Sequence, residues 1–278
     1  MAEQEAARIY EFGGVKLLLA HPDDVVSRWV GQEEVLKQVL AAWLVLGEGD
    51  LPLHPRVMGK SGSGKTTLLC AAAKQREQEV YMLQATMDMR PEDLLITPVI
   101  GGGGQIRYVA SALVTAMIRG GVCLLDEANR MGERTWAALA PLLDQRRYVE
   151  SIVTGLKIKA HPSFRFGVTM NEDAATFEIP AYIHARLQPQ IRLDFPTHED
   201  EMAILRAWLP FVDEEILEYV VDFLQRAHED DERFTVRDGL NIARYAAKLL
   251  DSETLPHEEA LYIATLQILG EEAHAYIE

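Results

Sequence analysis

Short apolar runs alternate with stretches of helical periodicity over the first two hundred residues of the chain. Apolar positions three and four residues apart predict helices over residues 33–46, 66–78, 107–119 and 134–147. Short apolar runs predict strands over residues 55–60, 79–86, 121–127, 164–171 and 191–196. Residues 148–160 resemble a β-hairpin that turns near Thr154 and Gly155. The alternation predicts an α/β fold, in which a mostly parallel sheet has helices on both faces.

The pattern changes after Pro196. Four further segments show helical periodicity, and no convincing strand lies among them. The sequence therefore predicts an α/β domain over residues 1–197 and a small α-helical lid domain over residues 198–278.

Composition narrows the class of protein. Of 278 residues, 48% are hydrophobic and 25% are charged, as in ordinary soluble globular proteins. No run approaches 18 apolar residues, and the start shows no secretory pattern, so we expect no membrane partner. Cys70 and Cys123 lie in apolar settings, which indicates buried free thiols and favours a cytoplasmic location. The net charge of −16 argues against a broad nucleic-acid surface.

A glycine-rich motif between a predicted strand and a predicted helix carries the strongest chemical signal. Residues 59–66 fit the pattern G-x-x-x-x-G-K-[ST], whose glycines let main-chain N–H groups point at phosphate oxygens. We expect Lys65 to reach the β- and γ-phosphates of ATP and the Thr66 hydroxyl to ligate Mg²⁺. The expected ATP-binding residues of this motif are Gly59, Lys60, Ser61, Gly62, Ser63, Gly64, Lys65, Thr66 and Thr67.

A second glycine-rich stretch, Gly101 to Gly104, fails the same test. No Lys-Ser or Lys-Thr follows it, and Pro98 before it suits a loop or an edge strand. From the residues alone, this stretch is either a floppy connector or a functional mobile loop.

Polar residues end two of the predicted strands. Asp126 and Glu127 follow an apolar run, at the edge of the sheet where α/β proteins bind ligands. We expect Asp126 to orient the shell of Mg²⁺ and Glu127 to polarise the attacking water. Asn171 ends another strand, where its amide can hold that water or sense hydrolysis.

Arginine side chains suit the oxygens of a γ-phosphate in both shape and charge. Arg186 precedes the last predicted strand, and Arg237 begins a helix of the second domain. Arg130, Arg146 and Arg147 can also face a neighbouring subunit, and composition does not choose among them.

Taken together, these motifs resemble those of AAA+ ATPases, most closely the MoxR-like group. The segments WVGQEEVLKQVLAAWL, LLDEANR, VTMN, ARL and TVRDGLNIARYA, with the P-loop, occur in family order and cover most of residues 25–250. The resemblance implies that Val30 and Gly31 lie beside the adenine of ATP. It also implies that Arg237 is the sensor arginine of the helical domain.

The same resemblance makes Arg186 an arginine finger that acts in trans on the ATP of the next subunit. The family usually has phenylalanine after the finger, whereas Leu187 follows here, and Arg192 is the nearest substitute. A finger in trans implies a ring, usually a homo-hexamer.

The resemblance further implies two inserts, over residues 85–106 and 148–160, that project toward the centre of the ring and touch a protein client. Gly101–Gly104 is then interpreted as a mobile turn within the first insert. Families of this kind often work with von Willebrand factor A proteins, and this chain contains no such domain.

The resulting hypothesis is an ATPase that couples hydrolysis of ATP, with Mg²⁺, to the remodelling or activation of a protein partner. The alternatives are a P-loop kinase, a nucleic-acid motor or loader, and a switch that binds ATP without hydrolysing it. The Asp-Glu pair and Asn171 argue against the kinase, and the acidity of the chain argues against the motor. Glu127 argues against the switch.

Overall fold

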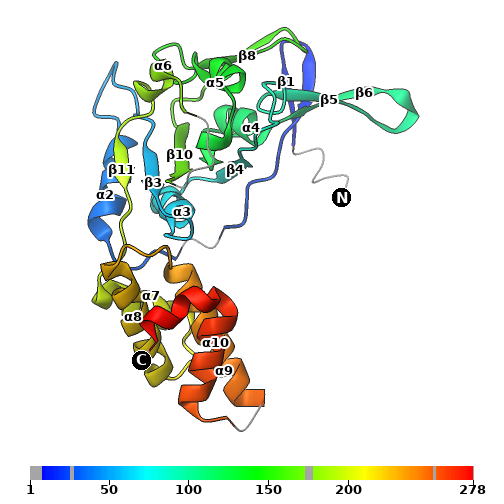
Figure 1. Ribbon diagram of the computed structural model, residues 1–278. Coiled ribbons are helices and arrows are strands. Elements are labelled where there is room, and N and C mark those ends of the chain that lie inside the picture. Colours follow the sequence, from blue (N-terminus) through cyan, green and yellow to red (C-terminus); the bar gives the residue numbers. More distant parts are fainter. Residues whose placement is uncertain (1–7, 26–27, 173–177, 253–254, 278) are drawn as a thin grey trace. The chain divides into compact units, whose positions relative to one another are not determined.

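The computed structural model describes residues 8–25, 28–172, 178–252 and 255–277, and it divides the chain into two compact units (Figure 1). The first, called here the sheet unit, comprises Met1–Ser27, Leu36–Met58 and Thr66–Arg192. The second, called the helical unit, comprises Arg28–Val35, Gly59–Lys65 and Leu193–Glu278. The glycine motif therefore clusters with the helical segment up to Lys65, and the residues from Thr66 onward cluster with the sheet.

A five-stranded sheet forms the centre of the sheet unit. Its strand order is β11-β3-β10-β7-β4, and the strands are β3 (Arg56–Gly59), β4 (Val80–Gln84), β7 (Val122–Asp126), β10 (Arg165–Asn171) and β11 (Gln190–Arg192). Both β4 and β10 run parallel to β7, and β11 runs parallel to β3. The predicted parallel sheet is confirmed, and parallel strands bring their carboxyl ends to one edge.

A second, four-stranded sheet has the order β1-β2-β6-β5. Its strands are β1 (Ile9–Phe12), β2 (Val15–Leu18), β5 (Ile96–Ile100) and β6 (Ile106–Ala110). The prediction of a continuous helix over residues 107–119 is wrong for its first part, because residues 106–110 pair with β5 as a strand. The helix α4 (Ala112–Arg119) begins only after Ser111, whose hydroxyl accepts a hydrogen bond from the main chain of Val114. It ends at Gly120, whose φ of 78° is the left-handed conformation expected of a glycine cap.

Two hairpins extend from the sheet unit. The strands β8 (Tyr148–Ser151) and β9 (Leu156–Lys159) form the hairpin predicted near Thr154 and Gly155. The four glycines lie at the tip of the β5–β6 hairpin, where the N–H of Gly101 donates to the carbonyl of Gln105 at 2.8 Å. Figure 1 shows this hairpin reaching away from the body of the sheet unit. That the tip moves remains a prediction.

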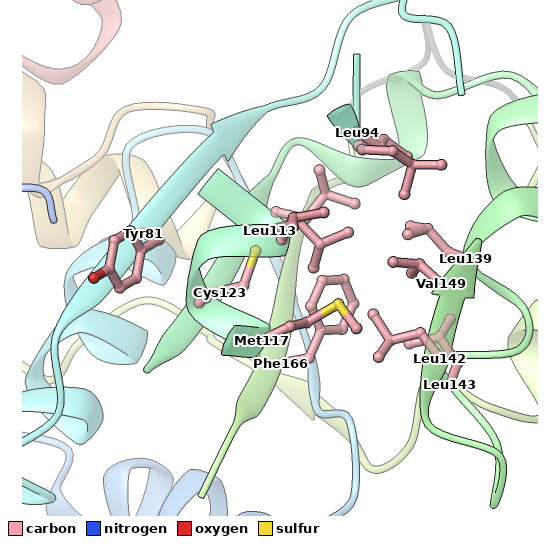
Figure 2. Close-up of a cluster of buried hydrophobic side chains, with 14 of the residues drawn as sticks. Tyr81, Leu94, Leu113, Met117, Cys123, Leu139, Leu142, Leu143, Val149 and Phe166 are labelled. Atoms are coloured by element: carbon pink, nitrogen blue, oxygen red, sulfur yellow. The ribbon is translucent and has the colours of Figure 1, made fainter. Parts of the chain in front are cut away.

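The core of the sheet unit lies between α4, the central sheet and the segment that leads into β8 (Figure 2). Met117 of α4, Phe166 of β10 and Val149 of β8 are almost completely buried there. The helix α5 (Glu133–Leu139) contributes Leu139 and ends before Pro141. Burying a side chain of this size contributes about 1.5–3 kcal/mol, so the base of the β8–β9 hairpin is anchored in the core.

Four helices build most of the helical unit, as the sequence predicts: α7 (His198–Trp208), α8 (Glu214–Glu229), α9 (Val236–Ser252) and α10 (His257–Leu269). Their apolar faces meet in a separate core that includes Leu205, Val220 and Ile242. The hydroxyl of Thr197 accepts from the main chain of Asp200 and so fixes the start of α7. Among the described residues, no helix is both long enough and apolar enough to cross a membrane.

Candidate active site

The glycine motif has the strand, loop and helix that its chemistry requires. β3 leads into the loop, and α3 (Lys65–Gln75) begins at Lys65. Gly59 and Gly62 have φ values of 155° and 86°, which side-chain-bearing residues rarely adopt. A Cβ atom at Gly59 would lie 2.5 Å from the carbonyl oxygen of Leu193, and one at Gly62 would lie 2.5 Å from the Thr235 hydroxyl. Both positions therefore need glycine.

The ammonium group of Lys65 lies inside this loop. Its side chain is buried, and Nζ donates to the carbonyl oxygens of Gly59 at 3.0 Å and Lys60 at 2.6 Å. A buried ammonium needs acceptors, and a bound phosphate would supply stronger ones at the amino end of α3. Ser61 is exposed in the loop, Ser63 donates its N–H to the carbonyl of Lys60, and Thr67 follows Thr66 in α3.

Residues of the helical unit contact the phosphate loop. Lys60 Nζ donates to the carbonyl and carboxylate oxygens of Asp231 at 2.7 and 3.0 Å, and it lies 4.6 Å from the centre of the Phe195 ring. The Cβ atom of Arg237 lies 3.3 Å from the Cβ position of Gly62. The helical unit thus brings Arg237, the predicted sensor arginine, beside the phosphate loop.

The predicted adenine segment also lies against this loop. Val30 is half-buried, and a Cβ atom at Gly31 would meet the Asp200 carboxylate at 2.5 Å. The ring of Trp29 lies 3.5 Å from the Cβ position of Gly64. Its indole nitrogen is buried, with no hydrogen-bond partner among the described residues. The sequence reading missed Trp29, although it directly precedes Val30.

At the carboxyl edge of the central sheet, Asp126 accepts two hydroxyl groups. Thr66 Oγ1 donates to Asp126 Oδ1 at 2.8 Å, and Thr169 Oγ1 of β10 donates to the same oxygen. A hydroxyl beside a carboxylate is a hard oxygen pair of the kind that Mg²⁺ uses, together with waters and substrate phosphates. Thr66 and Asp126 therefore fit the predicted magnesium site. Thr169 is a further member that the sequence reading missed.

Glu127 is held by groups from three directions. Its carboxylate accepts from Asn171 Nδ2 at 3.0 Å, from Gln84 Nε2 at 3.0 Å and from Arg130 Nε at 2.7 Å. Its main-chain N–H donates to Thr169 Oγ1 at 2.9 Å, and its φ of 52° is left-handed. The structure thus brings Glu127 and Asn171 together, as expected. Gln84 is new to the site, because only strand pairing places the end of β4 beside the end of β7.

The two candidate finger arginines lie apart from these contacts. Arg186 follows α6 (Ala181–His184), donates to the carbonyl of Tyr182 at 2.6 Å and lies 3.7 Å from Asp144. Arg192 ends β11 and pairs with Glu172 at 3.3 Å. Arg146 shares Asp144 with Arg186, while Arg147 donates to the carbonyls of His161 and Phe164.

Both cysteines are free and buried, as predicted. Burial raises the pKa of the Cys70 thiol to about 12, and the charge of Asp126 acts in the same direction. Burial likewise raises the pKa of Cys123. Neither thiol is therefore a nucleophile at neutral pH.

Similarity to known proteins agrees with this geometry. The family model of the AAA domain (dynein-related subfamily) matches residues 57–187, which contain the glycine motif, Asp126, Glu127 and Asn171. The denitrification regulatory protein NirQ of Pseudomonas aeruginosa is 31% identical over 156 residues, which are 53% of this chain and 56% of NirQ. These similarities support the resemblance of the chain to the MoxR-like AAA+ ATPases.

Further similarities extend over parts of other proteins. An uncharacterized protein of Staphylococcus aureus (strain USA300) is 30% identical over 127 residues, which cover 44% of this chain and 48% of that protein. The chain thus spans about half the length of the curated relatives that it matches. The RuvB Holliday junction branch migration motor of Thermotoga maritima has the same fold, with a TM-score of 0.58 and 18% identity. That match covers 86% of this chain and 70% of RuvB.

Proposed function

We propose that this AAA+ protein hydrolyses ATP to ADP and phosphate. The observation that carries the proposal is the arrangement at the sheet edge, where Glu127 contacts Asn171 while Asp126 contacts Thr66, the residue directly after Lys65. A carboxylate held by an amide at this edge can orient a water molecule for attack on the γ-phosphate. When bound, Mg²⁺ would neutralise charge on the phosphate oxygens of ATP.

Each residue of the candidate active site has a distinct task in this proposal. Lys65 binds the β- and γ-phosphates, and main-chain N–H groups of the loop bind the remaining phosphate oxygens. Thr66 and Asp126 would hold a magnesium ion through their oxygens. Glu127 orients the attacking water and accepts its proton, while Asn171 fixes the carboxylate through Oε1.

Nucleotide recognition rests on the residues around the loop. Val30 and Gly31 would lie beside the base, and Arg237 beside Gly62 would bind phosphate oxygens through its guanidinium. The two domains of the prediction, residues 1–197 and 198–278, are proposed to move relative to one another when ATP binds. A covalent cross-link between the two domains should abolish the hydrolysis of ATP and leave the binding of ATP intact.

We further propose a homo-hexameric ring in which Arg186 acts on the ATP of the adjacent subunit. A mixing experiment tests this directly. Arg186→Ala and Glu127→Gln subunits should each be inactive, yet their mixture should hydrolyse ATP, because an intact Arg186 can then serve an intact Glu127. The matched variant Arg192→Ala should retain turnover. A mixture that stays inactive, with both variants assembled, would assign Arg186 a role within its own subunit.

The work performed by hydrolysis is proposed to be the remodelling or activation of a protein partner. The relation to NirQ, whose name describes a regulatory protein, supports a role of this kind. A von Willebrand factor A domain protein is our candidate client. Co-purification with a Glu127→Gln trap should recover the client in an ATP-dependent manner. Stimulation of turnover by DNA or RNA, with no protein client recovered, would favour the nucleic-acid motor instead.

A further inference from the structure

A groove of about 380 Å³ lies beside β9 in the sheet unit. Its walls come from three elements of the sheet unit: Tyr10 and Phe12 of β1, Met117 and Ile118 of α4, and Lys157 and Lys159 of β9. None of these residues has a part in the proposed ATP chemistry. The groove therefore needs an explanation of its own.

The edge of β9 that faces this groove has unpaired main-chain groups. Ala160 donates its N–H to the carbonyl of Arg147 at 2.8 Å, which makes these residues a hydrogen-bonded pair of the antiparallel ladder. Because such pairs alternate, the N–H and C=O groups of Lys157 and Lys159 point away from β8. Among the described residues, β8–β9 is a two-stranded sheet, so no third strand pairs with these groups; directly after β9, His161 donates its N–H to the carbonyl of Met117 at 2.8 Å.

Aromatic side chains form the opposite wall. Tyr10 and Phe12 alternate with Ile9 and Glu11 along β1, so both rings lie on one face of the strand. The rings stack with their centres 6.4 Å apart, and the two residues are 39% and 38% exposed. Large aromatic side chains left open beside an unpaired strand edge are typical of a site that receives an extended peptide.

The charge at the groove identifies the chemistry of that peptide. The chain carries a net charge of −16, yet the exposed side chains along this edge are Lys157 and Lys159, with His161 beyond them. Glu150 faces Lys157 across the hairpin, so one of the two lysines already has an acidic neighbour. The local excess of positive charge favours an acidic partner.

We propose that an extended, acidic segment of a partner protein adds to β9 as a third strand of the β8–β9 sheet. Its main chain would pair with Lys157 and Lys159, its carboxylates would face the two ammonium groups, and its apolar side chains would lie on Tyr10 and Phe12. A nucleic acid offers no ladder of main-chain donors and acceptors to this edge. The proposal is independent of ATP hydrolysis.

Selection from a library of random linear ten-residue peptides on the full-length protein tests this inference. The selected peptides should be acidic and should carry apolar residues at alternate positions. The double variant Lys157→Glu/Lys159→Glu should bind the best of them at least about tenfold more weakly. Two N-methylated forms of that peptide are then compared, one methylated at the odd-numbered main-chain nitrogens and one at the even-numbered nitrogens. Only one of the two forms should lose binding, because only every second N–H of the added strand points toward β9.

A single position separates main-chain pairing from charge. Lys159→Pro removes an outward N–H while leaving the bond between Ala160 and Arg147 in place, and Lys159→Gln removes only the charge. Proline should weaken the peptide clearly more than glutamine does, with thermal unfolding confirming that both variants fold. Should the proline variant fail to fold, the N-methylated peptides carry the same test.

Four results would overturn the proposal. Selection could yield no peptides above background, or it could yield peptides without acidic bias. Binding could also be unaffected by the double lysine variant. Finally, a 15-nucleotide oligothymidylate could bind in a way that depends on both lysines while no peptide does, which would assign the groove to single-stranded nucleic acid.

Discussion

Glu201 of α7 should make the stability of the protein depend on pH between about 5 and 7. Its side chain is completely buried, and Oε2 accepts one hydrogen bond from Gln225 Nε2 at 2.8 Å. Oε1 has no partner among the described residues. Burial raises the pKa of Glu201 from 4.5 to about 7, while the hydrogen bond from Gln225 acts in the opposite direction.

The direction in which stability changes with pH depends on whether the folded or the unfolded chain holds the proton. Below pH 4.5 Glu201 is neutral in both the folded and the unfolded chain, so its contribution to stability is then fully present. Between pH 4.5 and 7 the unfolded chain loses the proton first, and stability falls as the pH rises. At about 1.4 kcal/mol per pKa unit, the full loss above pH 7 is about 3 kcal/mol.

Glu201→Gln removes this titration and keeps a polar group beside Gln225. We expect the variant to exceed the wild type in free energy of unfolding by up to about 3 kcal/mol at pH 8, and by under about 1 kcal/mol at pH 5. Urea unfolding followed by the far-ultraviolet circular dichroism of the helices measures both values. A difference that stays constant from pH 5 to pH 8 would show that Glu201 does not titrate in this range.

Three further predictions concern the nucleotide site. Gly62→Ala should lower the free energy of unfolding by about 2–4 kcal/mol, because φ is 86° and the new methyl group meets the Thr235 hydroxyl. The control variant Gly155→Ala has a φ of 67° but open space around it, so it should lower the free energy of unfolding by only about 1–2 kcal/mol. Urea titration measures both values. Asn171→Ala should reduce kcat for ATP by about tenfold to a hundredfold with little change in KM, since the amide acts on Glu127; equal changes in both constants would point to binding instead. Trp29→Phe should remove most of the tryptophan fluorescence change on ATP binding, and an unaltered signal in stopped-flow titration would place the base away from this ring.

The phosphate loop was predictable because its chemistry is local. Successive glycines, Lys65 and Thr66 lie within eight residues, and the positive φ angles at Gly59 and Gly62 are what such a loop requires. The four helices of the second unit were equally readable, since their apolar spacing matches the helical period. The expectation for Asp126, Glu127 and Asn171 to lie together followed from parallel strands that end at one edge.

Features that depend on which strands pair with one another could not be predicted from the sequence. Gln84 and Thr169 are unremarkable strand residues, and they reach Glu127 only because β4 and β10 flank β7. The predicted helix over 107–119 failed in its first part because Tyr108 and Val109 pair with β2 and β5, and a periodicity count cannot detect such partners. The β1–β2 hairpin was overlooked although Gly13 and Gly14, both with positive φ, are an ordinary signal for a two-residue turn.

Release of free phosphate from ATP by the purified protein and its Glu127→Gln variant tests the central claim most directly. The wild type should release phosphate in the presence of Mg²⁺, and the variant should do so about 10²–10⁴-fold more slowly while binding ATP with similar affinity. The amide of glutamine keeps the shape of the side chain but is not a base. Full turnover by Glu127→Gln, or phosphate found on an acceptor instead of in solution, would contradict the account.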